Sequence, residues 1–497
     1  MVFLLLLLGV TTAQASITKE EAPEYFPDGG AWYPRAEDFT LSRRQELVDL
    51  EVVPVENQAV AWNWGDVFKI SKDPTAFFGV RFDGYSAREN QLFTLASNTK
   101  LFTTAAALHF LGADYRFETQ LKWSQGSDAT QADNLVLVGS GDPTWGLRTV
   151  EKGIRTRVAA IVEEFGRAGI REVRGEFQVM SVDPRWDQLE FPPGWLESDK
   201  DECYGALPQG FNLQENCSTF RVTSPTTGSW LDEGVPTPVK LKITSGPKTA
   251  LSLQLVRDQR TRAFSYVVSG TWKSGAKAAD FWLPVHDVQG WVKNLFLAAL
   301  KKEGIAYNPS SSVAQAVSHP VMTFQSIPLS NILRPMNKLS SNLVAGALFQ
   351  AIGSQAQIQD YFQRLDPTLN TMTVYDGPGI SRLNQVTPSG MARFLEILRA
   401  DSNFPAVWNS LSIAGVDGTL ANRMEKTSAE GTVRGKTGTL SGVYNLSGFV
   451  PKYDAQRTIT DYIPFVIFGR SSPNYRLTVH AIQDRAAAHL FDVVNGP

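Results

Sequence analysis

Charge of one sign, cysteine and long apolar runs are all scarce in this 497-residue chain, and each shortage excludes a class of protein. Lysine and arginine number 47 against 50 aspartate and glutamate residues, so the formal net charge is only −3. No block of like charges stands out, which argues against a nucleic-acid partner, because such surfaces need clustered basic residues. Past the N-terminus, no segment approaches the roughly 18 uninterrupted apolar residues of a transmembrane helix. A permanent membrane anchor is therefore not expected.

Metal ligands and cofactor motifs are also few. The five histidines are scattered without H-E-x-x-H spacing, so no metal site is expected. The stretch GSGDPT lacks the last glycine of a dinucleotide loop because Thr144 takes its place, so no cofactor is expected either. No G-x-S-x-G elbow occurs, which argues against Ser-His-Asp hydrolysis of the α/β-hydrolase kind. The only cysteines, Cys203 and Cys217, suit one disulfide across a loop in an exported protein, with two buried free thiols as the alternative.

The N-terminal stretch MVFLLLLLGVTTAQA combines a short apolar run with Ala13-Gln14-Ala15, the small-x-small pattern of a signal-peptidase site. We therefore predict a signal peptide over residues 1–15 and an extended polar leader over residues 16–36. A buried apolar N-terminal strand is the alternative. Export without a lasting anchor favours the periplasm of a bacterium with an outer membrane, and a wall-associated exterior is the other possibility.

The pattern of apolar residues along the chain predicts helices and strands in alternating blocks. Residues 100–111 are rich in Ala and Leu at a spacing near 3.6, which predicts a helix that Gly112 ends. Strand and turn patterns dominate from about 118 to 320. Further helices are expected at 155–169, 341–353 and 387–400, strands near 432–450 and 463–470, and a helix at the C-terminus.

These blocks predict an interrupted domain. Residues 37–121 and 320–497 would form one domain, and residues 122–319 would be a mostly β insertion. We expect two inserted modules, with residues 144–218 nested inside the other. No internal repeat and no low-complexity tract were found.

Ser97 and Lys100 stand at the start of the first predicted helix. A spacing of three residues places both side chains on one helix face, about 5–6 Å apart by Cβ. The lysine amine could then remove the serine proton, and exposed helix N–H groups could stabilise an oxyanion. The same S-x-x-K spacing occurs at Ser16, Ser245 and Ser274, none of which begins a helix. An ordinary helix N-cap is the structural alternative for Ser97.

A second group, Ser340-Ser341-Asn342, precedes another predicted helix. A hydroxyl at Ser340 could relay a proton, and the amide of Asn342 could hold a substrate backbone while fixing a lysine. Ser-Ser-Asn is also a good capping sequence, and the same S-x-N pattern recurs at 472–474.

The third group, Lys436-Thr437-Gly438-Thr439, lies in a β-patterned run. A strand that only fills a core has no use for Lys436, and Gly438 weakens a strand unless another backbone comes close. We expect an extended peptide to add along this edge, with its free carboxylate held by Lys436 and the hydroxyls. A rival K-S-G at 273–275 lies in the inserted block.

In this order, the three groups resemble the S-x-x-K, S-x-N and K-T-G motifs of penicillin-binding proteins and serine β-lactamases. LVLVGSGDPTW, MNKLSSNLVAGAL, DGPGISRLNQVTP, AGVDGTL and VRGKTGTLSGV narrow the choice. They resemble the D-alanyl-D-alanine carboxypeptidase/endopeptidase family of low-molecular-mass penicillin-binding proteins, which carries a large insertion between its first two motifs. The resemblance spans roughly residues 37–490, and the gap from Ser97 to Ser340 is far too long for a small β-lactamase.

The resemblance implies an α+β fold: a transpeptidase or β-lactamase-like domain, with helices on both faces of an antiparallel sheet, split by inserted mostly β domains. It also implies roles for the nucleophile Ser97, the general base Lys100, the relay and clamp Ser340 and Asn342, the electrostatic partner Lys436, and the substrate-binding residues Thr437, Gly438 and Thr439. Backbone N–H groups of Ser97 and Thr439 would form the oxyanion hole. Leu95, Ser341 and Pro378 depart from the family pattern and bear on substrate fit more than on catalysis.

The predicted function is therefore an exported serine DD-peptidase. It would cleave the terminal D-alanine of peptidoglycan stem peptides, or a D-alanine-containing cross-link, through an acyl-enzyme, and β-lactam antibiotics would acylate Ser97. A β-lactamase or esterase of the same fold is one alternative, which fast drug turnover would favour over slow release. A non-catalytic peptidoglycan-binding homologue is the other, and the intact motif set argues against it.

Overall fold

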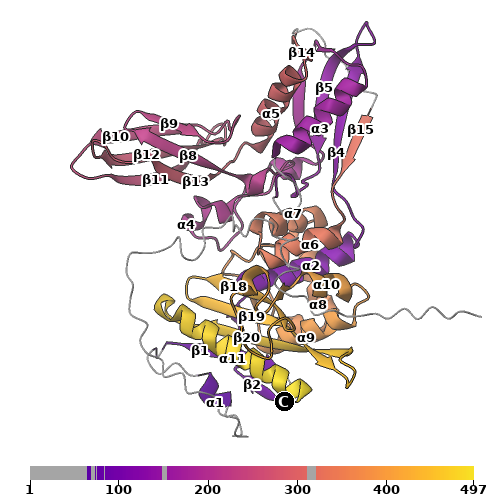
Figure 1. The fold of residues 1–497 in the computed structure, drawn as a ribbon, viewed down its shortest axis with the longest axis vertical. Helices are drawn as coiled ribbons and strands as arrows, with labels where there is room; N and C mark the ends of the chain where they lie inside the picture. Colours follow the sequence, from indigo (N-terminus) through magenta and orange to yellow (C-terminus); the bar gives the residue numbers. More distant parts are fainter. Residues whose placement is uncertain are drawn as a thin grey trace, which may run out of the picture.

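In the computed structural model, the described residues are 64–68, 73, 75–82, 84–147, 154–309 and 321–496. The predicted signal peptide and leader lie outside them. The chain forms three lobes, one of which holds both the first and the last described elements (Figure 1). None of the helices described combines the length and the apolar character needed to cross a bilayer.

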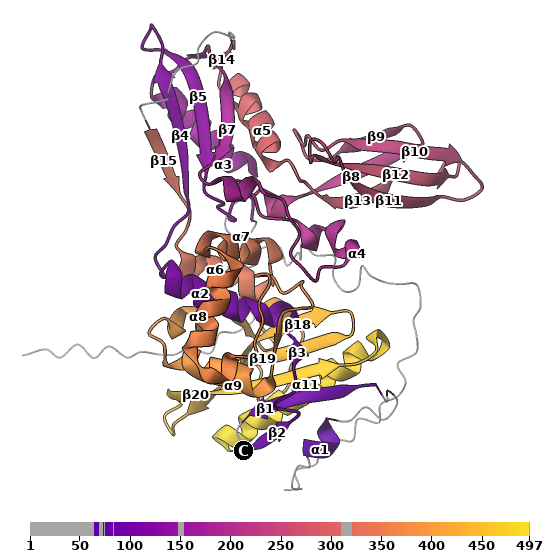
Figure 2. The same cartoon turned by 180° about the vertical axis from the view of Figure 1, so that it is seen from behind.

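The main lobe is built on a six-stranded, fully antiparallel sheet. Its strands, in spatial order, are β17 (Ser412–Ile413), β18 (Arg434–Leu440), β19 (Val443–Tyr453), β20 (Ile459–Arg470), β1 (Phe77–Phe82) and β2 (Tyr85–Ala87). Helix α11 (Arg476–Asn495) packs on one face and α9 (Pro388–Ala400) on the other (Figures 1 and 2). An antiparallel sheet with helices on both faces confirms the predicted α+β class.

Helix α2 (Thr99–Phe110) runs through the middle of the helical layer and confirms the helix predicted at 100–111. Its residues from Thr99 to Leu108 are all buried, because neighbouring helices surround it. On its inner side, the ring of Phe102 stacks on Phe394 of α9 at 4.0 Å. The other helices of this layer are α6 (Leu329–Lys338), α7 (Asn342–Ile352), α8 (Gln355–Leu365) and α10 (Phe404–Ser410).

The second lobe holds another sheet, covered by α3 (Ile154–Arg167) and α5 (Val288–Lys302) (Figure 1). Its strands, in spatial order, are β14 (Ala306–Tyr307), β6 (Glu172–Val173), β5 (Gln131–Gly139), β4 (Glu118–Gln125) and β15 (Val321–Gln325), with β7 (Phe177–Ser181) also paired to β5. The sheet reaches slightly past residues 122–319 at both ends. The domain borders at these positions stay a prediction.

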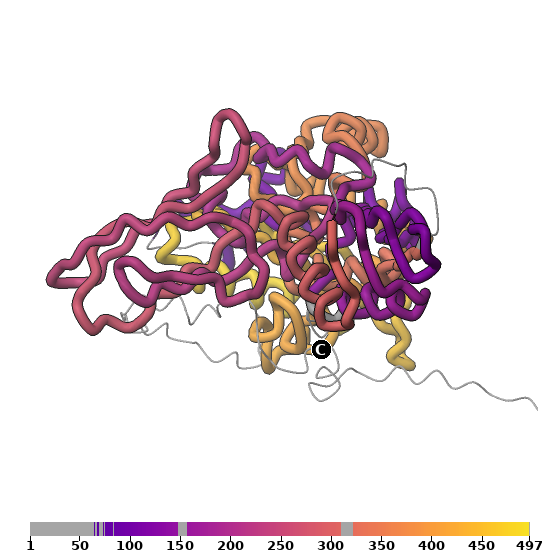
Figure 3. Tube along the Cα trace, turned by 90° about the horizontal axis from the view of Figure 1, so that it is seen from above, coloured from indigo at the N-terminus to yellow at the C-terminus, as the bar shows by residue number. Residues whose placement is uncertain are grey.

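The third lobe is nested inside the second and projects away from the main lobe (Figures 1 and 3). It packs two three-stranded sheets: β13 (Ala279–Pro284), β8 (Cys217–Ser224) and β9 (Thr227–Trp230); and β10 (Val239–Ser245), β12 (Phe264–Trp272) and β11 (Ala250–Arg257). The expected nesting of residues 144–218 therefore does not match the strand pairing. Strands β6 and β7, from that range, pair in parallel with β5 after the crossover helix α3, so they belong to the second lobe.

The link between the second and third lobes consists of short turns: η2 (Pro184–Asp187), α4 (Glu197–Lys200), η3 (Cys203–Gly205) and η4 (Gln214–Asn216). The predicted disulfide is confirmed here, since Cys203 and Cys217 are bonded across a sequence separation of 14. It ties η3 to the first residue of β8.

Replacing both cysteines by alanine should lower the free energy of unfolding by about 3 kcal/mol, because the disulfide restricts the unfolded chain. Urea denaturation of the protein with and without reductant measures the same loss. The double variant serves as the control, since reductant should have no further effect on it. Equal stability of oxidised protein and double variant would contradict the expectation.

Candidate active site

The three motif groups, far apart in the sequence, meet in the main lobe. Lys100 Nζ donates hydrogen bonds to Ser97 Oγ at 2.9 Å and to Asn342 Oδ1 at 2.7 Å. Lys436 Nζ donates to Ser340 Oγ at 2.9 Å. The structure therefore brings together all five side chains that the sequence nominated for catalysis.

Ser97 lies in a single 3₁₀ turn, η1 (Ala96–Asn98), directly before α2, and makes no capping hydrogen bond to that helix. The N-cap alternative is therefore not what the structure shows. Ala96 has a φ of 47°, an uncommon left-handed conformation for a residue with a side chain. Gly379 permits this turn, because a Cβ on it would lie 2.0 Å from the Ala96 carbonyl oxygen.

Lys100 is fully buried and has a third acceptor, the carbonyl oxygen of Pro378 at 2.6 Å. Burial lowers the pKa of the amine to about 7, although the negative charges of Asp376 and Glu215 oppose part of this shift. Near neutral pH, a substantial fraction of Lys100 is therefore uncharged. An uncharged amine beside a hydroxyl can accept its proton.

Lys436 is also fully buried, and its pKa lies well below the ordinary value because of burial and the repulsion of Lys100. Its second acceptor is the Thr437 carbonyl oxygen at 2.9 Å. Its partner Ser340 adopts a φ of 59°. Ser341, which lies between Ser340 and Asn342, is the N-cap of α7, because its side chain accepts the backbone N–H of Val344 at 3.2 Å. The side chains of Ser340 and Asn342 therefore remain available to the site.

Strand β18 offers an open edge beside these groups. Strand β17 pairs only with Arg434 and Gly435, so within the described chain no strand covers residues 436–440 on that side. Gly438 is buried because the chain's own turn approaches it: a Cβ would lie 2.7 Å from the Leu95 carbonyl oxygen. Thr439 is exposed at the end of this edge, as a substrate contact needs to be.

Two residues contribute to the site through their backbone carbonyl oxygens, and no sequence motif indicated them. One is Pro378, described above, which the sequence marked only as a departure from the family pattern. The other is Tyr204 of η3, whose carbonyl oxygen accepts the Asn342 amide at 2.9 Å. A nearby contact joins the same inserted link to the main lobe, since Trp195 Nε1 donates to Asp376 Oδ2 at 2.7 Å. The inserted link thus forms part of the wall of the site.

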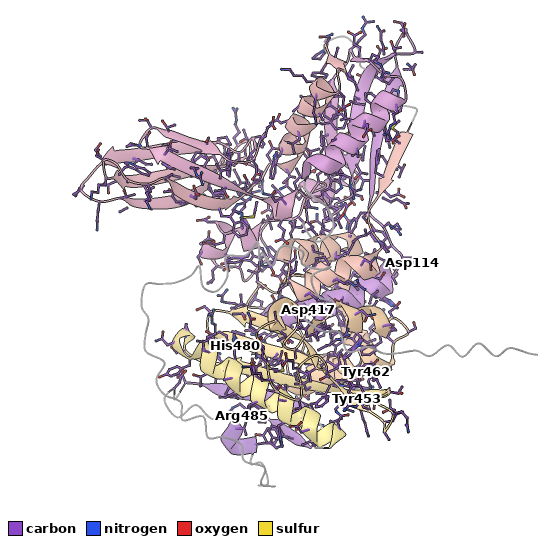
Figure 4. All side chains as sticks on the ribbon, viewed as in Figure 1. Asp114, Asp417, Tyr453, Tyr462, His480 and Arg485 are labelled. Carbon is purple, nitrogen blue, oxygen red and sulfur yellow. A yellow bond between two sulfur atoms is a disulfide. The ribbon has the colours of Figure 1, made fainter. Side chains whose placement is uncertain are left out.

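A buried ion pair joins Lys338, at the end of α6, to Asp417. Both side chains are only 9% exposed, and Asp417 also accepts the backbone N–H of Ile413 at 2.8 Å. The same loop carries Thr419, to which Thr437 Oγ1 donates at 2.8 Å. Figure 4 labels Asp417 in the main lobe. The pair therefore links the residue two positions before Ser340 to the loop that contacts β18.

A model of the D-Ala-D-Ala carboxypeptidase 3 (S13) family matches residues 84–468. The chain belongs to this family. Membership confirms the predicted family and the predicted enzyme class, a serine-type D-Ala-D-Ala carboxypeptidase. In the described residues, no group of three or more His, Cys, Asp or Glu side chains could hold a metal ion.

Two curated relatives are similar to this chain over most of its length. A D-alanyl-D-alanine carboxypeptidase of Actinomadura sp. (strain R39) is 28% identical over 442 residues, which are 82% of this chain and 78% of the relative. D-alanyl-D-alanine carboxypeptidase DacB of Haemophilus influenzae is 25% identical over 381 residues, which are 71% of this chain and 77% of the relative.

A solved structure has the same fold as this S13 chain. Penicillin-binding protein 4 (dacB) from Haemophilus influenzae matches with a TM-score of 0.70 and 22% identity, over 86% of this chain and 99% of that one. A second structure of that protein, complexed with a novel β-lactam, matches with a TM-score of 0.67 and 21% identity, over the same shares of both chains. This likeness confirms the predicted penicillin-binding protein fold.

Asp417→Ala should lower the free energy of unfolding by about 3–5 kcal/mol, because it leaves the Lys338 amine buried without its counter-charge. Asp461→Ala is the matched control, since its ion pair with Arg399 is 43% and 34% exposed. We expect it to cost less than about 1 kcal/mol. Chemical denaturation of both variants measures the difference, and equal losses would contradict the role assigned to the buried pair.

Proposed function

We propose that this chain is an exported serine DD-peptidase that cuts after the penultimate D-alanine of peptidoglycan stem peptides through an acyl-enzyme on Ser97. The observation that carries the proposal is the buried Lys100 amine, with a pKa of about 7, at 2.9 Å from Ser97 Oγ. Burial alone requires the amine to have oxygen acceptors, but at this distance an uncharged amine can also remove the Ser97 proton, as a general base does.

In the first step, Ser97 Oγ attacks the carbonyl carbon of the penultimate D-alanine and its proton passes to Lys100. The backbone N–H groups of Ser97 and Thr439 stabilise the oxyanion of the tetrahedral intermediate. The C–N bond then breaks, and the terminal D-alanine leaves after its nitrogen gains a proton, which Ser340 relays. In the second step, water gives one proton to the uncharged Lys100 and adds its hydroxyl to the acyl carbon. The bond between that carbon and Ser97 Oγ then breaks, Oγ takes the proton back from Lys100, and the shortened peptide leaves with a free carboxylate.

The open edge of β18 supports the mode of substrate binding. An extended peptide would pair with the backbone of residues 436–440, and its terminal carboxylate would lie near Lys436, Thr437 and Thr439. Gly438 keeps this strand close to the nucleophile turn. A cross-linking peptide that contains D-alanine is the second substrate of the same arrangement. Its cleavage would add endopeptidase action.

The partners and the location complete the proposal. The relatives include a penicillin-binding protein complexed with a β-lactam, which supports β-lactams as covalent inhibitors of this chain. The signal-peptide pattern at residues 1–15 supports export to the periplasm, where peptidoglycan peptides are available. A β-lactamase of the same fold would differ in releasing the drug quickly.

Benzylpenicillin should add its mass once to the mature protein, and peptide mapping should place the adduct on the peptide that contains Ser97. Ser97→Ala should give no adduct, because the attacking oxygen is gone. Thr103→Ala, on the next turn of α2, is a control that keeps the nucleophile. No adduct together with no drug hydrolysis would favour the peptidoglycan-binding alternative, and rapid drug turnover would favour the β-lactamase.

The acylation rate should rise about tenfold per pH unit below pH 7 and level off above it, because only the uncharged form of Lys100 can accept the proton. The inflection should fall near the Lys100 pKa of about 7. Stopped-flow measurements with a chromogenic β-lactam test this. Lys100→Arg should acylate very slowly at every pH, since a guanidinium does not lose its proton. A flat profile for the unmodified protein would exclude Lys100 as the base.

A further inference from the structure

Strand β10 lies at the open edge of the nested lobe. It pairs with β12 on one side, and within the described residues no strand pairs with its other side. The Tyr266 N–H of β12 donates to the Pro238 carbonyl oxygen at 2.9 Å, so alternate residues from Pro238 onward direct their backbone groups to β12. The backbone groups of Val239, Leu241 and Ile243 therefore face outward.

A hollow of about 620 Å³ lies beside this edge. Its lining comes from the β8–β9 hairpin (Phe220, Pro225, Thr226 and Gly228) and from β10 (Val239, Leu241, Lys242, Ile243 and Thr244). The side chains of Val239, Leu241 and Ile243 are only half-buried, although they are aliphatic. The edge thus presents apolar side chains at every second position, together with free backbone groups at the same positions.

The opposite face of β10 is basic. Lys240 and Lys242 alternate with the apolar residues and are exposed. The neighbouring strands contribute Val267, Ser269, Ser252 and Gln254 to this face, and none of its residues is acidic. Residues 217–284 contain nine Lys and Arg against four Asp and Glu, whereas the whole chain has a formal charge of −3. The lobe as a whole therefore carries an excess of positive charge, to which Lys240 and Lys242 contribute at this edge.

We propose that the β10 edge binds an extended segment of a partner protein in which acidic and apolar side chains alternate. The partner's backbone would pair with residues 239–243, its apolar side chains would fill the hollow, and its carboxylates would lie opposite Lys240 and Lys242. A polypeptide fits this edge better than a polysaccharide does, because the free donors and acceptors repeat with the period of a strand.

Lysines on an edge strand also have a simpler use, since they prevent sheets from pairing edge to edge. That use requires neither a hollow nor half-buried aliphatic side chains on the other face. The two readings differ in one measurable respect. Only a docking edge binds a matching peptide.

The probe is a fluorescein-labelled, nine-residue synthetic peptide of alternating Glu and Val, titrated with the full chain and followed by fluorescence anisotropy at low salt. A peptide with the same composition, but with Glu and Val in separate blocks, is its control. Lys242→Glu should weaken binding of the alternating peptide about tenfold, because an attraction becomes a repulsion. Arg260→Glu changes the charge equally, in the exposed β11–β12 turn, and should leave the dissociation constant within about twofold.

Hydrogen exchange locates the bound peptide. Saturating peptide should slow exchange of the Leu241 and Ile243 amides, which no strand of the described residues pairs with. Penicillin acylation of every variant checks that the main lobe is folded, and it separates failure of this proposal from failure of the proposed peptidase. No saturable binding, equal binding of the block peptide, equal effects of the two variants, or protection elsewhere than β10 would each overturn the proposal.

Discussion

The burial of one amine sets the requirements for the rest of the main lobe. Lys100 Nζ has three oxygen acceptors, on Ser97, Asn342 and Pro378, and these come from three separate parts of the chain. A buried amine is costly unless such acceptors surround it, so these segments must be held at fixed positions. Helix α2 is buried on all sides and holds Lys100, and Gly438 lets β18 approach the turn that carries Ser97. Stability and chemistry therefore depend on the same contacts.

The inserted residues are part of this arrangement and not a separate appendage. The amide of Asn342 accepts from Lys100 at one end and donates to the Tyr204 carbonyl at the other, so the inserted link fixes which way the amide points. Tyr204 follows Cys203, and the disulfide anchors that turn to β8. A second contact, from Trp195 to Asp376, holds the link on the loop that supplies Pro378. The geometry around Lys100 thus depends on residues from both lobes.

Much of this could be predicted from the sequence, because the informative signals are local. Each informative pattern lies within a few residues, as do the S-x-x-K spacing, the Ala and Leu pattern of α2 and the K-T-G run. The order of the three motifs along the chain then indicated the family. The nesting could not be predicted, since alternation identifies strands without saying which strands pair, and β6 and β7 join β5 in parallel through α3. Tyr204 and Pro378 were missed for another reason. Each acts through a backbone carbonyl, which every residue type possesses.

Two of the open strand edges in the described residues, those of β18 and β10, show how burial assigns different uses to the same residue type. On β18, Lys436 is fully buried, and its pKa is lowered by burial and by Lys100, so its charge depends on the groups around it. On β10, Lys240 and Lys242 are exposed, so they interact with a charged partner at a range that salt controls. A buried lysine on an edge suits a site where protons move. Exposed lysines on an edge suit recognition of a charged chain, and the hollow beside β10 supplies the apolar part of that recognition.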